Sequence, residues 1–333
     1  MTNTKIIKLS SNENCYGCSP LALQAIESNY RAVHLYPEVS PVALKEKIAA
    51  QFGVSPKNII VGAGSVRIID GLIQTYVGSD EEVLTFEKSF VAYGQLSGFQ
   101  KRKCHFAPLS DFRCLPENLL PLINNKTRLV FIANPNNPTG TIITHVELEM
   151  LLSKISSDIT VVIDEAYSEY STNTSFPDSL ALQKKYPNLV ILHSFSKIYG
   201  LAGLRIGYAI MEEHKATRMI QNKIPFSVNY LSSDAAIASL NDQEFIHHSA
   251  ISNAAQRDYL YSELTRLDFH VVPSQANFLY LWFDKEDEKK KVYDTLFQNG
   301  ILICDLNVFG QQKSLRITIG KKETNQRIIA MLS

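Results

Sequence analysis

The chain has 333 residues, of which 45% are hydrophobic and 20% are charged; this is typical of a folded globular protein and excludes a disordered or collagen-like chain. Its length exceeds that of one ordinary core, so we expect two domains. Lysine plus arginine and aspartate plus glutamate both number 33, and this zero formal charge argues against nucleic acid or a polybasic membrane contact as partner.

The first forty residues predict a loop, a helix from about Pro20 to Arg31 and a turn at Tyr36 and Pro37. The start of the chain lacks an apolar run long enough for a signal peptide, and no stretch approaches the roughly twenty apolar residues of a membrane span. We therefore expect a cytoplasmic location.

The five cysteines are an odd number in a long chain, which argues against a disulfide framework. Cys15 and Cys18 form a Cys-x-x-Cys pattern, yet no second Cys or His pair stands at the spacing of metal ligands. We interpret them as ordinary loop thiols and expect no metal site; a redox or zinc role is the alternative.

Five short apolar runs, rich in β-branched residues, alternate with segments of helical length. This pattern predicts buried, mainly parallel strands with crossover helices, and hence an α/β fold. The runs are residues 59–61, 82–86, 129–133, 159–163 and 189–192.

After Tyr208 the pattern changes to α+β, which suits a smaller second domain. A long helical stretch is predicted from about 232 to 267, and a further helix near 286–298. Short strands are predicted at 270–272, 277–282 and 315–319.

Ligands of open α/β sheets lie beyond the carboxyl ends of the strands, so the residues that end each run are candidate site residues. The first run ends in Gly62-Ala63-Gly64-Ser65 and leads into a helix from about Val66, an arrangement that can hold a phosphate on free N–H groups. A dinucleotide-binding fingerprint would need a glycine at position 67, where this sequence has Arg67, and this argues against an NAD-dependent dehydrogenase. A plain strand-to-helix turn is the other alternative.

Three further runs end in polar residues. Residues 134–140, Asn-Pro-Asn-Asn-Pro-Thr-Gly, predict a rigid turn or a plain loop. Asp164 comes directly after a five-residue apolar run, where a buried carboxylate needs a partner for its charge. This partner is either a helix N-terminus or a cationic nitrogen of a ligand. Lys197 leaves another buried strand, eight residues before Arg205, and desolvation can keep its amine partly neutral, as Schiff-base chemistry requires.

In this order and spacing, three motifs resemble those of the fold-type I pyridoxal-phosphate aminotransferases, and within them the histidinol-phosphate aminotransferase branch. They are Asn-Pro-Asn-Asn-Pro-Thr-Gly, Asp-Glu-Ala-Tyr at 164–167, and Ser-Phe-Ser-Lys with the glycine-rich stretch to residue 207. The resemblance runs from Leu9 to Arg327, nearly the whole chain. It implies a mainly parallel seven-stranded sheet with helices on both faces, in a large domain of residues 38–235. A small α+β domain would combine residues 1–37 and 236–333.

The resemblance also implies the roles of the catalytic residues. Lys197 would form the internal aldimine with pyridoxal 5′-phosphate and, once released, move the proton of the substrate. Asp164 would pair with the pyridinium nitrogen, so that the ring can accept electrons. Asn137 and Tyr167 would bind the ring hydroxyl, and Tyr93 would stack on the ring.

The remaining roles that the resemblance implies concern anions. The cofactor phosphate would lie on the backbone amides of Gly64, Ser65 and Val66, with Ser194, Ser196 and Arg205 around it. Tyr36 would reach the cofactor phosphate of the neighbouring subunit in a homodimer.

On the substrate side, the resemblance implies Arg316 and Arg327 as anion-binding residues and Tyr16 and Asn277 as pocket residues. The implied reaction is a ping-pong transfer of an amino group from L-histidinol phosphate, or a related amino compound, to 2-oxoglutarate. A decarboxylase similar to threonine-phosphate decarboxylase, an aromatic aminotransferase and a non-catalytic binding module are the alternatives.

This sequence departs from the family pattern at three places near the site. Val66 and Arg67 replace a common Asp-Glu pair, and Cys15 and Cys18 replace two prolines. His193 replaces an arginine. These departures bear on the substrate more than on the cofactor.

Overall fold

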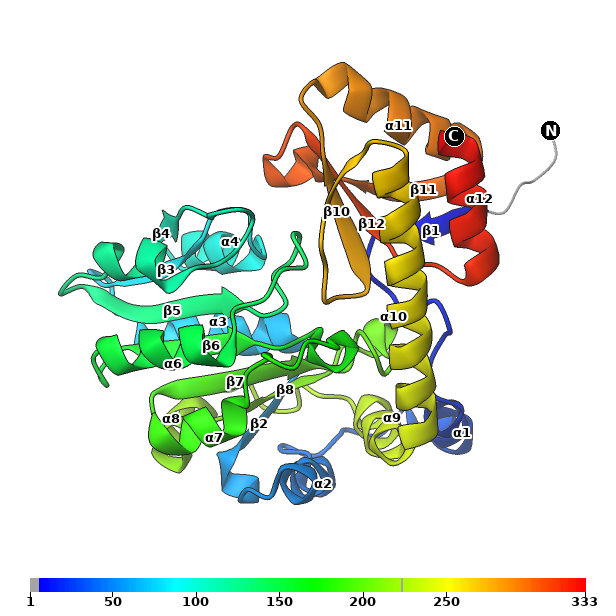
Figure 1. Cartoon of the computed structure of the whole chain (residues 1–333). Helices are drawn as coiled ribbons and strands as arrows, with labels where there is room; N and C mark the ends of the chain where they lie inside the picture. Colours follow the sequence, from blue (N-terminus) through cyan, green and yellow to red (C-terminus); the bar gives the residue numbers. More distant parts are fainter. Residues whose placement is uncertain (1–5, 223) are drawn as a thin grey trace.

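The computed structural model describes residues 6–222 and 224–333, which form two β-sheets with helices packed against them (Figure 1). The larger sheet has seven strands in the order β2-β8-β7-β6-β5-β3-β4. Strands β3 to β7 run parallel to one another, whereas β8 is antiparallel to both β2 and β7. The strands are β2 (Ile59–Gly62), β3 (Glu82–Phe86), β4 (Lys103–Ala107), β5 (Thr127–Ala133), β6 (Thr160–Asp164), β7 (Leu189–Ser194) and β8 (Gly207–Ile210). The predicted α/β class with a mainly parallel sheet is confirmed.

Alternation along the strands divides the core of the large sheet into two layers. Val162 and Leu192 belong to the cluster on one face, while Ile163 and Ile191 belong to the cluster on the other, as expected when successive side chains point to opposite faces. The first face packs against α3 (Ser65–Tyr76), α4 (Ala92–Phe99) and α8 (Glu213–Gln221). The second packs against α2 (Val42–Phe52), α5 (Pro116–Leu119), α6 (His145–Lys154) and α7 (Ser179–Lys185). Both faces are therefore covered, which explains why these strands are apolar throughout.

The smaller sheet joins the beginning of the chain to its last quarter. Its five strands lie in the order β1-β11-β12-β10-β9, and β1 pairs in parallel with β11. Their bounds are β1 (Ile7–Leu9), β9 (His270–Val272), β10 (Phe278–Trp282), β11 (Ile301–Asp305) and β12 (Ser314–Thr318). A separate apolar core lies between this sheet and residues of α10 (Gln243–Arg266), α11 (Glu286–Gln298) and α12 (Lys322–Leu332).

The long helical stretch predicted from 232 to 267 is two helices, α9 (Tyr230–Asn241) and α10. They separate at Asp242, whose side chain accepts a hydrogen bond from the backbone N–H of Phe245 at 3.3 Å and so caps α10. Figure 1 shows α10 passing from α9 to the small sheet. It connects the two parts of the molecule.

Within the segment 1–37, which is predicted to belong to the small domain, β1 lies in the small sheet and is followed by α1 (Pro20–Asn29). Helix α1 lies beside α9 in Figure 1, and Ala22 is part of the core cluster beneath the large sheet. Sequence periodicity did not predict β1, β4, β8 or β11, all of which have at most five residues.

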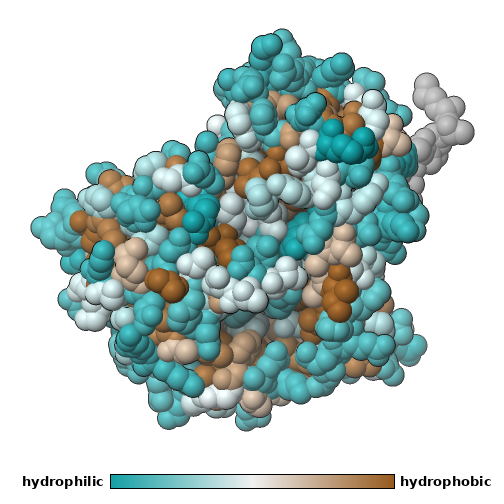
Figure 2. Space-filling model, viewed as in Figure 1, coloured by the Kyte–Doolittle hydropathy of each residue, from teal (hydrophilic) through white to brown (hydrophobic). Residues whose placement is uncertain are grey.

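The exterior agrees with the balanced composition. Hydrophilic side chains cover most of the face in Figure 2, with apolar patches between them. Within the described ranges, no helix combines the length and apolar character needed to cross a membrane.

Candidate active site

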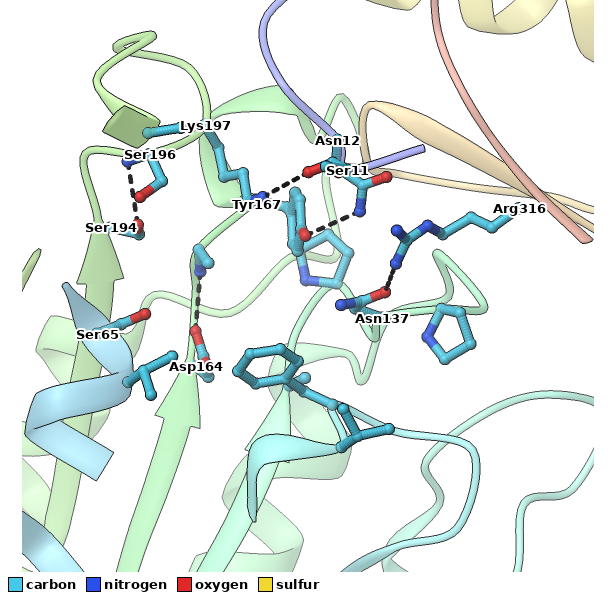
Figure 3. Close-up of a pocket in the computed structure, with 18 of the residues that line it drawn as sticks. Ser11, Asn12, Ser65, Asn137, Asp164, Tyr167, Ser194, Ser196, Lys197 and Arg316 are labelled. Atoms are coloured by element: carbon cyan, nitrogen blue, oxygen red, sulfur yellow. Dashed lines mark hydrogen bonds between the residues drawn. The ribbon is translucent and has the colours of Figure 1, made fainter. Parts of the chain in front are cut away.

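A pocket of about 400 Å³ lies where the two sheets meet, at the carboxyl ends of β6 and β7 and the N-terminus of α3. The large sheet contributes Asp164 and Lys197, and the small sheet contributes Arg316. Figure 3 shows Lys197 and Arg316 entering from opposite sides, with Tyr167 between them. The pocket therefore holds a primary amine, a carboxyl group and a guanidinium within one enclosure.

Asp164 is the last residue of β6, and its side chain is 5% exposed. Its Oδ2 accepts a hydrogen bond from the Tyr93 hydroxyl at 2.8 Å, and its Oδ1 accepts one from the backbone N–H of Ala166 at 3.2 Å. Burial raises the pKa of the Asp164 carboxyl to about 6, although these hydrogen bonds and the nearby Lys197 ammonium oppose the shift. A cationic ligand at this carboxyl would stabilise its ionised form.

Tyr93, which is predicted to stack on a ligand ring, is not among the residues that line the pocket. Tyr93 is fully buried in the first turn of α4, where its ring stacks on Phe131 at a centroid distance of 4.7 Å. Its hydroxyl holds Asp164 from behind. The aromatic residue that lines the pocket is Phe90, three residues earlier. The sequence has two aromatic residues in this short segment, and it does not show which of them faces the pocket.

Lys197 follows β7 after a two-residue turn, and its side chain reaches across the pocket. The Nζ donates a hydrogen bond to the backbone carbonyl of Ser11 at 3.2 Å and lies 5.3 Å from the centre of the Tyr167 ring. The amine is thus held by a backbone oxygen rather than by a carboxylate, which leaves it free to exchange this contact for one with a ligand.

Tyr167 is 6% exposed and is oriented by Asn12. The Asn12 Nδ2 donates to the Tyr167 hydroxyl at 3.0 Å, and the backbone N–H of Asn12 donates to the Thr318 hydroxyl at 3.0 Å. Asn12 has a φ of 58°, in the left-handed region that asparagine tolerates better than most residues. The sequence did not predict this role of Asn12.

The N-terminus of α3 and the Arg205 guanidinium form an anion-binding corner. Gly64 precedes the helix with a φ of 81°, and a Cβ there would lie 2.6 Å from the Arg205 Nη2. Arg205 donates from Nη1 to the Ser196 hydroxyl at 3.3 Å, and the Ser194 hydroxyl accepts from the Ser196 backbone N–H at 3.0 Å. The predicted residues Ser65 and Val66 also line this corner. Free N–H groups, a helix dipole and a guanidinium suit a phosphate.

Arg316 forms the opposite, small-domain wall. It is 6% exposed on β12; its Nη1 donates to the Asn137 Oδ1, and its Nη2 donates to the Ser10 carbonyl at 2.8 Å. The Nε has no partner within the structure. Asn137, predicted to bind a ligand ring, does line the pocket, with its oxygen turned toward Arg316. Arg316 is thus a second buried cation, apart from Arg205.

Comparison with known proteins decides the family. Residues 4–332 match the family model "Aminotransferase class I and II". The chain belongs to this aminotransferase family. It is 40% identical over 330 residues to the histidinol-phosphate aminotransferase of Anaeromyxobacter sp. (strain Fw109-5). The aligned region covers 99% of this chain and 90% of that protein.

Solved structures give the same fold. The histidinol-phosphate aminotransferase of Sinorhizobium meliloti, solved with pyridoxal-5′-phosphate, superposes with a TM-score of 0.91 at 25% identity, over 98% of this chain and 90% of that one. The L-threonine-O-3-phosphate decarboxylase of Porphyromonas gingivalis superposes with a TM-score of 0.84 at 26% identity, over 98% of both chains. The predicted fold-type I architecture is confirmed, and two activities share it.

Two predicted substrate residues of this aminotransferase lie outside the pocket. Asn277 is 2% exposed, and its Nδ2 donates to the carbonyls of Asn12 at 3.1 Å and Glu13 at 3.4 Å, so it positions the pocket wall. Arg327 is on α12, and its guanidinium donates to the Asn299 carbonyl at the end of α11. Arg327 therefore stabilises the small domain in this structure and does not reach the ligand space.

The other two displaced predictions are tyrosines. Tyr16 is partly exposed, with its ring edge-on to His248 at 5.2 Å, and it does not line the pocket. Tyr36 is 87% exposed and lies against Phe226 at 5.5 Å, away from the pocket of its own chain. An exposed Tyr36 agrees with the predicted role in a neighbouring subunit but does not test it.

The departures from the family pattern of the aminotransferases have different consequences. Arg67 forms an ion pair with Asp70 on the same helix. Cys15 and Cys18 are free, and burial raises the pKa of the Cys15 thiol to about 11, which keeps it protonated. His193 faces away from the pocket, on the other side of the large sheet.

The pocket also contains residues that the sequence did not single out. Because they lie in loops, turns and short 3-10 helices, no periodicity marks them. They are Ser10, Glu13, Ser89, Phe90, Val91, Ala202, Phe309 and Gln311.

Proposed function

We propose that this aminotransferase uses pyridoxal 5′-phosphate to transfer an amino group from L-histidinol phosphate to 2-oxoglutarate. The observation that carries the proposal is the meeting of Lys197, the buried Asp164 and the anion corner at Arg205 in one pocket. The 40% identity to a histidinol-phosphate aminotransferase, over almost the whole chain, supports the amino donor.

The donor groups of the pocket fit this cofactor. Asp164 is a buried carboxyl that would hold the protonated ring nitrogen, and the N-terminus of α3 with Arg205 would hold the phosphate. A Cβ at residue 64 would lie 2.6 Å from the Arg205 Nη2 and would have to adopt a φ of 81°, so glycine suits this corner. Lys197 supplies the primary amine that would hold the aldehyde. When bound, the cofactor supplies an electron sink for the bond-breaking at the substrate.

Each of the pocket residues would then have a separate role in the reaction. The Nζ of Lys197 takes up and returns the proton of the substrate carbon, because it is the only amine among the residues that line the pocket. Asp164 keeps a proton on the ring nitrogen, and that cation lowers the raised pKa of its carboxyl. The Tyr167 hydroxyl, held by Asn12, orients the ring.

Arg316 supports the ping-pong order. Lys197 is assigned to the cofactor aldehyde and Arg205 to the cofactor phosphate, so Arg316 is the remaining cation among the residues that line the pocket. L-Histidinol phosphate and 2-oxoglutarate both carry an anionic group, so each would use Arg316 in turn. One recognition site for two substrates favours alternate rather than simultaneous binding.

The decarboxylase of P. gingivalis provides a second candidate, because its fold matches at a TM-score of 0.84. An anion corner, a lysine and an aspartate serve both reactions equally. An aromatic aminotransferase is the third candidate, since Phe90 and Phe309 give the pocket an apolar part.

A half-reaction screen separates these candidates. The cofactor-loaded enzyme is mixed with L-histidinol phosphate, L-threonine O-phosphate or phenylalanine, without a keto acid, and the visible absorbance of the cofactor is followed. We expect L-histidinol phosphate to convert the cofactor fastest, and 2-oxoglutarate to reverse the change with release of glutamate. Carbon dioxide release without a keto-acid requirement, or absence of bound cofactor in the wild type, would contradict the proposal.

A homodimer, a cytoplasmic location and the division into domains 38–235 and 1–37 plus 236–333 remain part of the proposal. The dimer is supported by a run of exposed apolar residues before α2: Val33 is 66%, Leu35 58% and Tyr36 87% exposed. Light scattering of the purified enzyme should give twice the mass of the chain; a monomer that retains full activity would refute the dimer and leave the assigned reaction untouched.

A further inference from the structure

Three polar side chains share one face of the small sheet. Arg316 lies on β12, and Tyr280 is its direct partner on the antiparallel strand β10. Ser314 comes two residues before Arg316 on the same strand, so all three side chains point to the same face. Because Arg316 lines the active-site pocket, this is the face of the small sheet that is turned toward the pocket (Figure 3).

Gln311 is bound to this group through its side-chain oxygen. Tyr280 is 1% exposed, and its hydroxyl donates a hydrogen bond to the Gln311 Oε1 at 2.9 Å. The Tyr280 oxygen also lies 2.6 Å from the Ser314 hydroxyl. A phenol has one proton, which Gln311 accepts, so the Ser314 hydroxyl is the donor to Tyr280. The oxygen of the Gln311 amide is therefore directed at the sheet.

The surrounding structure holds Gln311 and Tyr280 in place. The backbone N–H of Gln311 donates to the Leu306 carbonyl at 3.0 Å, and the backbone N–H of Ser314 donates to the Gln311 carbonyl at 3.3 Å. The ring of Phe112 packs against Tyr280 at a centroid distance of 5.5 Å. Gln311 is thus a preorganised group, which loses little conformational freedom when a ligand binds.

The nitrogen of the Gln311 amide is free for a ligand. Gln311 is 8% exposed and lines the active-site pocket. Its Nε2 donates to no group in the described part of the chain, and it is not one of the unpartnered polar atoms that are sealed from solvent. An amide nitrogen carries two N–H donors and no acceptor. Gln311 therefore offers hydrogen-bond donors to the pocket beside Arg316.

The charges on this side of the pocket favour an anion. The structural partners of Arg316 are two neutral oxygens, the Ser10 carbonyl and the Asn137 Oδ1. Glu13 also lines the pocket, but its carboxylate forms an ion pair with Lys8. A buried guanidinium whose charge is not balanced by these neighbours gains most from an anionic ligand.

We propose that Gln311 is a substrate-binding residue of this aminotransferase, and that its amide N–H groups and the Arg316 guanidinium together hold an oxyanion. The inference rests on the proposed function for the identity of the ligands, which are the phosphate of L-histidinol phosphate and a carboxylate of 2-oxoglutarate. Both groups have several acceptor oxygens and can bind the fork of Arg316 and the amide at once. Because the amide is neutral, it adds hydrogen bonds without fixing the charge of the ligand, which suits a site that receives a phosphate and a carboxylate in turn.

Equilibrium titration of the full-length, cofactor-loaded enzyme tests this subsite without turnover. Inorganic phosphate and succinate are the probes, since the cofactor phosphate already occupies the corner at Arg205 in the proposed function. Gln311→Met keeps the length of the side chain but removes the N–H groups, so it should raise the Kd of both anions by about tenfold. Gln311→Glu also introduces a like charge and should raise them by about 100-fold.

Gln312 provides matched controls, because this neighbouring glutamine is exposed and is not among the pocket residues. Gln312→Met and Gln312→Glu should bind both anions as the wild type does. In steady-state kinetics, the two Gln311 variants should raise KM for both substrates more than they lower kcat, since a donor to the bound anion acts before and during the reaction alike. Unfolding curves of all four variants verify that each is folded.

The outcomes separate this inference from the proposed function. Anion Kd values in the Gln311 variants that equal those of the Gln312 variants, or that fall below the wild-type values, would overturn the inference even if the wild type transfers amino groups as proposed. If the wild type does not react with L-histidinol phosphate but binds both anions with the expected dependence on residue 311, the proposed function fails and the anion subsite stands.

Discussion

The two walls of the active-site pocket are built in different ways. On the large-sheet side, Asp164 ends the buried parallel strand β6 and Lys197 follows β7 after a two-residue turn, so the hydrogen bonds of the sheet fix the positions of both. On the small-domain side, residues 10–13 and Arg316 come from segments about 300 residues apart, which hold each other through the bond from Arg316 to the Ser10 carbonyl. In the proposed function, the chemistry therefore depends on a rigid, local arrangement, and substrate selection depends on a non-local one.

Removal of the Lys197 amine is the strongest test of the large-sheet wall. Lys197→Ala should lower kcat by about 10⁴-fold, because the group that carries the proton is lost. The visible absorbance of the bound cofactor should change as well, while Lys184→Ala, on the exposed face of α7, should match the wild type in both measurements. A kcat within tenfold of the wild type would place the reacting amine elsewhere.

Asp164→Asn should have the next largest effect. An amide keeps an acceptor for the Tyr93 hydroxyl but cannot balance a cation, so we expect a loss of about 10²- to 10³-fold in kcat. Steady-state kinetics with the cofactor at saturation measures it. Asp158→Asn, at an exposed site before β6, is the matched control. Equal kinetics in the two variants would show that the charge of Asp164 is not used.

A pair of arginine variants tests the small-domain wall. Arg316→Lys removes the planar fork and should raise KM for both substrates by about 10- to 100-fold, with a smaller effect on kcat. Arg327→Ala should change KM less than about twofold and lower Tm by a few degrees, since its guanidinium binds the Asn299 carbonyl. Reversal of these two results would restore the substrate role that the resemblance implies for Arg327.

Asn12 contacts both walls of the pocket. A substitution by glycine at this position tests its side-chain hydrogen bond separately from its backbone conformation. Asn12→Gly keeps the positive φ but loses the bond to Tyr167, so kcat should fall by about tenfold with little change in KM. Asn12→Ala should lose the same activity and an additional 1–2 kcal/mol or so of stability, because alanine disfavours this conformation. Similar unfolding curves for the two variants would argue against the backbone strain.

The smallest expected effect is the pH dependence of stability in the cofactor-free protein. The pKa of Asp164 is raised to about 6 in the folded chain, above its usual value near 4, so its protonated form stabilises the fold at low pH. This contribution is present below about pH 4 and is lost as the pH rises to 6. The difference in Tm between wild type and Asp164→Asn should change over this window; a constant difference would contradict the assignment.

The sequence predicted the large-sheet wall well because its signals are local. Asp164 ends one buried strand and Lys197 closely follows another, and strand alternation then decides which face each neighbour occupies. The small-domain wall could be predicted only in part, because Arg316 reaches the pocket through the pairing of β12 with β10 and β11. Arg327 is on α12, the next element along the chain, and it donates to the Asn299 carbonyl at the end of α11. Nothing in the local sequence distinguishes the two arginines.

Tyr93 shows a different limit. The segment from Ser89 to Tyr93 marks an aromatic site, but both Phe90 and Tyr93 satisfy the pattern. Which ring faces the pocket depends on where α4 begins and on the stacking of Tyr93 against Phe131. These are properties of the packed core. The motif therefore predicts which segment lies near the pocket, but only the fold determines which of its side chains faces the pocket.

The pairing of Ile7 with Ile301 sets an order of events during synthesis of the chain. At 5–20 residues per second, a ribosome needs on the order of 15–60 s to travel from β1 to β11, and all seven strands of the large sheet emerge before that. During this interval residues 10–13 cannot be anchored by the small sheet, and the carbonyl of Ser11 that holds Lys197 is not yet in place. The nascent chain therefore builds its core first and completes its catalytic site only near the end of translation.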